Sequence, residues 1–139
     1  MSATEPQAEA RHRHGAGFLA LVAESRTRVR TFSLDAFLER LHRGDQFVLL
    51  DNREDHEWRL GHLPGAHHLS KGVLEREIEA AVPDKDTPIV CYCGGGYRSV
   101  LACDNLQRMG YTDVYSLDGG WRDWISRGLP TVVPEGDAR

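Results

Sequence analysis

Short apolar runs recur along the chain and end in charged or turn-forming residues. Such runs are typical of strands that are buried on both faces of a parallel sheet. They lie at positions 47–50, 88–92 and 114–117. The segment 66–69 follows a turn that contains Pro64 and Gly65, and we predict a further short strand there.

Stretches with helical spacing of apolar residues lie around these strands. The predicted helices cover positions 34–43, 73–82, 99–109 and 121–127. Strands that alternate with helices across short loops require parallel crossover connections. The pattern therefore predicts an α/β fold in which helices cover both faces of a central sheet.

The residues before position 30 differ from the rest of the chain. Residues 1–16 are rich in Ala, Glu, His and Arg, which predicts a flexible tail. Phe18, Leu21 and Val22 share one face of a helix predicted over 17–29. We therefore expect one α/β domain preceded by an extra helix. We expect this domain to span residues 30–133 and residues 134–139 to form a flexible C-terminus.

Targeting signals in the sequence are weak. The apolar run at 16–23 is barely long enough for a signal peptide, and acidic Glu5 and Glu9 precede it. No run approaches the length of a membrane span. A surface helix and a cytoplasmic location are the favoured interpretation.

Composition narrows the class of protein. The 139 residues are 40% apolar and 27% charged, which is ordinary for a globular protein and excludes wholesale disorder. A net charge of −4 disfavours nucleic-acid binding, which usually needs a basic patch. Three cysteines cannot form a disulfide framework, so a reducing compartment is expected.

One loop has the composition of a nucleophilic site. Cys93 ends a predicted strand, at the edge of the sheet where α/β proteins bind ligands. Glycines allow several backbone N–H groups to turn toward one point, and such donors favour a thiolate. Arg98 adds positive charge at the rim. The candidate site comprises Cys93 as nucleophile and Gly94, Gly95, Gly96, Tyr97, Arg98 and Ser99 as the cradle.

The remaining cysteines and histidines have simpler interpretations. Cys91 lies two residues earlier in the same strand and Cys103 lies within the next helix, so both are expected in the core. The cysteines contain no C-x-x-C pair, which makes a zinc site weak. The His-rich segment 11–14 is expected to be a solvated part of the tail rather than a metal site.

Three separated motifs resemble those of single-domain rhodaneses. The loop at 92–99 is similar to the family's active-site loop, in which four residues separate a cysteine from an arginine. The stretches 50–66 and 117–130 resemble its N-terminal and C-terminal motifs, and Asn52 departs from the residue type usual there. The residues that carry the N-terminal resemblance are Leu50-Asp51-Asn52-Arg53, Glu57-Trp58 and Gly61-His62-Leu63-Pro64-Gly65-Ala66. Those that carry the C-terminal resemblance are Leu117-Asp118-Gly119-Gly120-Trp121, Trp124 and Gly128-Leu129-Pro130.

The resemblance implies a three-layer rhodanese-like sandwich around a five-stranded parallel sheet. It also implies sulfur transfer through a persulfide on Cys93, from a donor such as thiosulfate to an acceptor such as cyanide or a thiol. Such a double displacement needs no metal and no organic cofactor. The implied partners are a small-molecule donor and acceptor, or a protein thiol as acceptor, and no nucleic acid or membrane. The sequence does not distinguish a monomer from a homodimer.

Two other functions fit parts of the pattern. A persulfide carrier or docking module with little turnover would need the same cradle. Phosphatases and arsenate reductases on similar scaffolds use five residues between cysteine and arginine, whereas four separate Cys93 from Arg98. The smaller loop suits a sulfur atom better than a phosphate, so this class ranks last.

Supporting residues are assigned more weakly. We expect Asp51 to pair with Arg98 or hold its backbone, the alternative being a structural role, and Arg53 to pair with Glu54 or Glu57 as part of the scaffold rather than to contact substrate. Lys71 is expected to be a solvated side chain, and the alternative is that it faces the pocket and attracts anions into it. Trp121 and Trp124 are expected in the core and the pocket wall, and the Tyr97 side chain is expected to point away from the cradle and to affect access or partner choice.

Overall fold

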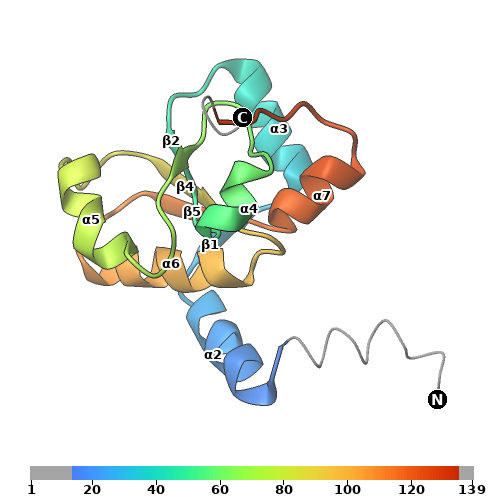
Figure 1. Cartoon of the computed structure of the whole chain (residues 1–139). Helices are drawn as coiled ribbons and strands as arrows, with labels where there is room; N and C mark the ends of the chain where they lie inside the picture. Colours follow the sequence, from blue (N-terminus) through green and yellow to red (C-terminus); the bar gives the residue numbers. More distant parts are fainter. Residues whose placement is uncertain (1–13, 135–139) are drawn as a thin grey trace, which may run out of the picture.

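Five parallel strands form one sheet, in the order β1-β5-β4-β2-β3 (Figure 1). The computed structural model describes residues 14–134. The strands are β1 (Arg30–Phe32), β2 (Val48–Asp51), β3 (His67–His68), β4 (Ile89–Tyr92) and β5 (Val114–Leu117). The parallel sheet confirms the predicted α/β class.

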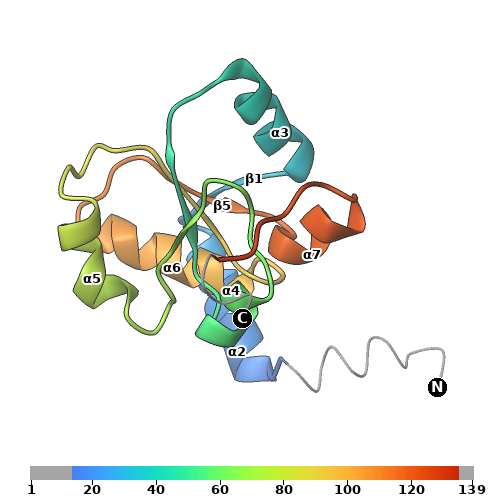
Figure 2. The same cartoon turned by 45° about the horizontal axis from the view of Figure 1, so that its top comes forward.

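Helices cover both faces of this sheet. They are α2 (Ala16–Arg26), α3 (Leu34–Arg43), α4 (Asp55–Arg59), α5 (Leu74–Ala81), α6 (Tyr97–Arg108) and α7 (Gly120–Ser126). Figures 1 and 2 show α5 and α6 on one side of the strands and α3 and α7 on the other. The three layers therefore match the expected sandwich.

Strand β4 shows how the apolar run produces two cores. Ile89 and Cys91 belong to the cluster that includes residues of α5 and α6, whereas Val90 and Tyr92 belong to the cluster that includes residues of α3 and α7. Successive side chains of a strand point to opposite faces. A strand covered on both faces must therefore be apolar at every position.

Two short elements were not predicted. β1 is an edge strand of three residues that pairs with β5, and two of its residues are polar. α4 has five residues, and reciprocal hydrogen bonds between Glu54 and Glu57 close its first turn as a capping box. Both elements are too short for hydrophobic periodicity to reveal them.

Helix α2 lies against α6, outside the three layers (Figure 1). It begins at Ala16 and buries Val22. The prediction that Leu21 shares the buried face was wrong, because the side chain of Leu21 is 51% exposed. A helix that packs mainly against one neighbour buries only a narrow stripe, and Leu21 lies beside that stripe.

Part of the predicted tails lies outside the described residues, namely 1–13 and 135–139, with Arg11, His12 and Arg13 among them. The prediction of a flexible, solvated tail was wrong for residues 14–16, because His14 packs against Phe18 and Tyr97 and α2 begins at Ala16. Within residues 14–134, none of the helices combines the length and hydrophobicity that crossing a membrane requires.

Candidate active site

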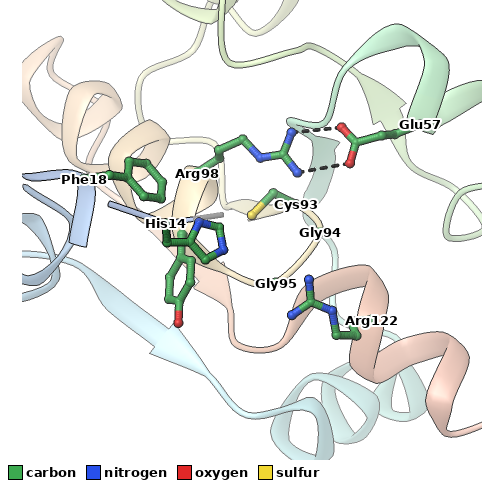
Figure 3. Close-up of a pocket in the computed structure, with 9 residues that line it drawn as sticks. His14, Phe18, Glu57, Cys93, Gly94, Gly95, Arg98 and Arg122 are labelled. Atoms are coloured by element: carbon green, nitrogen blue, oxygen red, sulfur yellow. Dashed lines mark hydrogen bonds and ion pairs between the residues drawn. The ribbon is translucent and has the colours of Figure 1, made fainter. Parts of the chain in front are cut away.

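Cys93 directly follows β4, where the chain turns into α6. Its Sγ accepts hydrogen bonds from the backbone N–H of Gly96 (3.2 Å) and of Ser99 (3.4 Å), and the Ser99 hydroxyl lies 3.5 Å away. Cys93 is only 1% exposed, yet it lines a pocket (Figure 3). Backbone amides thus point inward at the sulfur, as the glycine-rich loop predicts.

The three glycines of the loop have close neighbours. A Cβ on Gly94 would lie 3.1 Å from Nη2 of Arg98, and one on Gly95 would lie 3.1 Å from Nη1 of Arg122. Gly96 caps α6 with φ +100°, a conformation that other residues rarely adopt. Gly96 is therefore fixed by its backbone conformation, whereas a side chain at Gly94 or Gly95 would push the end of Arg98 or Arg122 aside.

The first turn of α7 holds the backbone of this loop. Trp121 N–H donates to the Cys93 carbonyl (2.8 Å), and Arg122 N–H donates to the Gly94 carbonyl (2.9 Å). A Cβ on Gly120 would lie 2.2 Å from the Cys93 carbonyl oxygen. The C-terminal motif therefore acts as a backbone clamp on the cysteine loop, which the sequence did not reveal.

Arg98 pairs with Glu57 of α4, not with Asp51 as predicted. Its Nη1 and Nη2 donate to the two carboxylate oxygens at 2.9 and 3.2 Å (Figure 3). Burial raises the pKa of Glu57, but hydrogen bonds from Arg98 and the Glu54 backbone outweigh it and lower that pKa to about 2. The same hydrogen bond raises the pKa of Arg98. Both groups are charged at neutral pH, so the pair carries little net charge.

Asp51 and Arg53 form a pair of their own behind the loop, so the predicted partners of both residues were wrong. Nη2 of Arg53 lies 2.8 Å from Oδ2 of Asp51 and also donates to the Gly61 carbonyl at 2.6 Å. Tyr92 donates its hydroxyl to the same carboxylate, and burial together with the Asp51 charge raises the pKa of Tyr92. Asp51 is 0% and Arg53 2% exposed. These residues brace the scaffold and do not line the pocket.

Lys71 also lies away from the pocket. Its Nζ donates to Oε2 of Glu75 at 3.0 Å, and it lines a separate hollow beside Asp104. The alternative prediction, that Lys71 faces the pocket, was wrong. Its ammonium group instead binds the carboxylate of Glu75, which α5 places four residues along the chain.

A domain model described as a rhodanese-like domain matches residues 33–127. The chain belongs to the rhodanese-like family. Among its relatives, a sulfurtransferase of Allochromatium vinosum is 33% identical over 78% of this chain and 99% of that protein. The thiosulfate sulfurtransferase GlpE of Pseudomonas fluorescens is 39% identical over 65% of this chain and 80% of its own.

The fold also resembles solved structures. One is a Rhodopseudomonas palustris protein of unknown function, described as a possible tyrosine phosphatase. It has a TM-score of 0.77 and 28% identity, and the match covers 85% of this chain and 96% of that one. The family match and the five-stranded parallel sheet show a rhodanese-like fold, and the two relatives described above are named as sulfurtransferases.

The rhodanese pocket has walls that the sequence did not predict. It encloses about 350 Å³. Its lining residues are His14, Phe18, Glu57, Cys93, Gly94, Gly95, Tyr97, Arg98 and Arg122. His14 and Phe18 precede the part of the chain that the family model matches. Tyr97, predicted to point away from the loop, lies on the pocket wall beside them. The sequence held no signal for Arg122.

The other predicted core residues are in place. Cys91 and Cys103 are buried free thiols, and burial raises the pKa of Cys103 well above its usual value. Trp124 is in the core, and Trp121 covers the Arg53 guanidinium at 4.5 Å, but neither residue lines the pocket. Residues 14–134 contain no group of three or more His, Cys, Asp or Glu side chains arranged to hold a metal ion.

Proposed function

We propose that the protein transfers a sulfane sulfur from a donor such as thiosulfate to a thiophilic acceptor, through a persulfide on Cys93. The observation that carries this proposal is the pair of backbone N–H groups, from Gly96 and Ser99, that point at Sγ of Cys93. Fixed N–H donors stabilise negative charge that develops beside them. The relatives named as sulfurtransferases support the same activity.

The reaction runs in two displacements. The Cys93 thiolate attacks the outer sulfur of thiosulfate, a new S–S bond forms, and sulfite leaves with the electrons of the old bond. The terminal sulfur of the persulfide then carries the negative charge beside the loop amides. Cyanide or a thiolate attacks that sulfur and removes it, which restores the Cys93 thiolate. The pocket above the loop gives both small molecules access to the sulfur.

The pairing of Arg98 argues against phosphatase chemistry. An arginine that binds a phosphate in a cysteine loop needs its N–H fork free for two oxygens. Arg98 instead gives both terminal nitrogens to Glu57. Together with the four-residue spacing from Cys93, this pairing favours sulfur over phosphate as the transferred group.

The proposal is tested by thiocyanate formation from thiosulfate and cyanide. We expect saturable turnover in the wild type and none above background in Cys93→Ser. Cys91→Ala is the matched control, because it removes a buried thiol two residues away and should retain turnover. Persulfide formation with negligible turnover would instead assign the protein as a carrier, and phosphate release from a generic ester would favour the phosphatase class.

A further inference from the structure

Three aromatic side chains form one wall of the pocket, and two of them come from the N-terminal extension. This aromatic wall consists of His14, Phe18 and Tyr97 (Figure 3 labels His14 and Phe18). The His14 ring stacks on Phe18 with centroids 5.5 Å apart and meets Tyr97 edge-on at 4.8 Å. Phe18 and Tyr97 are 6.2 Å apart. The rings therefore lie next to one another and form a continuous aromatic surface beside Cys93.

Helix α2 and the residues that follow it are fixed to α6 by polar contacts, of which the one from Ser25 is buried. Ser25 donates to Oδ2 of Asp104 at 2.8 Å, and Arg28 donates to both oxygens of that carboxylate at 3.1 and 2.7 Å. Asp104 is buried, and the Arg28 hydrogen bond lowers its pKa, so it is charged at neutral pH. Val22 adds apolar burial on the same side. The aromatic wall is thus held against the body of the domain by specific contacts.

The opposite side of the pocket carries one permanent positive charge without a partner. Arg98 is neutralised by Glu57. The guanidinium of Arg122 lies beside Gly95 (Figure 3). No carboxylate among residues 14–134 is within ion-pair distance of it. The pocket therefore matches a ligand with a single negative charge better than a dianion such as thiosulfate.

We propose that the aromatic wall makes the pocket selective for organic sulfane-sulfur donors that carry one negative charge, such as aryl thiosulfonates. This inference rests on the proposed function. The aromatic group packs on the wall, and the sulfonyl oxygens face Arg122. A volume of about 350 Å³ lies in the range of sites for organic ligands. The apolar group gains free energy from the wall that inorganic thiosulfate cannot gain.

The chemistry is the same displacement with a different leaving group. The Cys93 thiolate attacks the terminal sulfur of R–SO₂–S⁻, and the S–S bond of the donor breaks. The sulfinate R–SO₂⁻ leaves with the bonding electrons, and Cys93 holds the persulfide. No oxidant or reductant is needed, because the sulfane sulfur only changes its partner.

The test compares three donors with cyanide as the common acceptor: benzenethiosulfonate, methanethiosulfonate and thiosulfate. In such a double displacement kcat/KM for the donor reports the first step alone. We expect wild type to prefer benzenethiosulfonate over methanethiosulfonate by about tenfold, the value of burying one aromatic ring against others. Phe18→Ala should reduce this ratio to about twofold, and Phe18→Leu should reduce it by less.

Leu21→Ala is the matched control, because Leu21 lies on the same helix but is exposed and does not line this pocket. It should leave the ratio of the two thiosulfonates unchanged. Since all donors are measured on one preparation, a loss of folded protein cancels in the ratio.

The outcomes separate the two proposals. Equal loss with all three donors in Phe18→Ala, or no preference for the aryl donor in wild type, would mean that α2 has a purely structural role. Sulfur transfer itself would stand in either case. If no donor gave turnover or a persulfide in wild type, the proposed function would be wrong as well.

Discussion

The two sides of Cys93 are built from similar ion pairs that serve different purposes. Behind the loop, Asp51 and Arg53 are buried and bind Tyr92 and the Gly61 carbonyl. At the pocket rim, the side chain of Glu57 is 27% exposed and that of Arg98 is 30% exposed. The buried side has no water to replace a lost partner, whereas the rim does. The scaffold side should therefore control stability, and the rim should control reactivity and selectivity.

The largest effect on stability is expected on the scaffold side. Arg53→Met leaves the Asp51 carboxylate buried without its cation, which should lower the free energy of unfolding by about 3–5 kcal/mol. Urea denaturation measures it. Arg127→Met, which breaks the exposed pair with Asp35, should cost less than about 1 kcal/mol. Equal losses in the two variants would contradict the distinction between buried and exposed pairs.

The backbone clamp should show the next largest effect. In Gly120→Ala the new Cβ would meet the Cys93 carbonyl, so the loop must shift. Displacement of a reacting atom by about 1 Å can reduce a rate by about 100-fold, and we expect a loss of that order in sulfur transfer.

Gly128→Ala isolates the strain of the backbone. Gly128 also has positive φ, +72°, but a Cβ there would have no atom within 4 Å. The Gly128→Ala variant should lose about 1 kcal/mol in its free energy of unfolding and retain its sulfur-transfer activity. Full activity in Gly120→Ala would show that the clamp does not position Cys93.

The smallest effect on stability is expected at the rim, and it depends on pH. The folded-state pKa of Glu57 is lowered to about 2 from an ordinary value of 4.5. Its contribution is therefore fully present above about pH 4.5 and is lost as the pH falls toward 2. Glu57→Gln should cost about 1 kcal/mol or less at pH 7, because water screens the pair.

The stability difference between wild type and Glu57→Gln should vanish between pH 4.5 and 2, as followed by urea denaturation at each pH. A difference that stays constant through this window would show that the pair does not contribute through its charge.

Local patterns predicted the parts of the structure that depend on neighbours in sequence. The apolar run at Ile89–Tyr92 predicted a buried strand, and the glycines after Cys93 predicted inward amides at the sulfur. β1 was missed because three residues at a sheet edge carry no periodic signal.

Pairings between distant side chains could not be predicted in this way. Arg98 has several acidic residues within reach of a folded chain, and its choice of Glu57, 41 positions away, depends on where α4 lies. The pairing of Asp51 with Arg53 is local, two residues along the chain, but Glu54 and Glu57 are also near Arg53 in the sequence, so proximity alone did not select the partner. Phe18 and Arg122 reach the pocket from α2 and α7. Nothing near Phe18 in the sequence marks it as part of a site, and the Gly119-Gly120-Trp121 motif before Arg122 does not show which of its neighbours faces the pocket.

Mass spectrometry of the intact protein after treatment with thiosulfate tests the central claim most directly. We predict a gain of one sulfur atom, located on Cys93 by peptide mapping, removed by cyanide and absent from Cys93→Ser. A gain located on Cys91 or Cys103, or no gain at all, would contradict sulfur transfer at this loop.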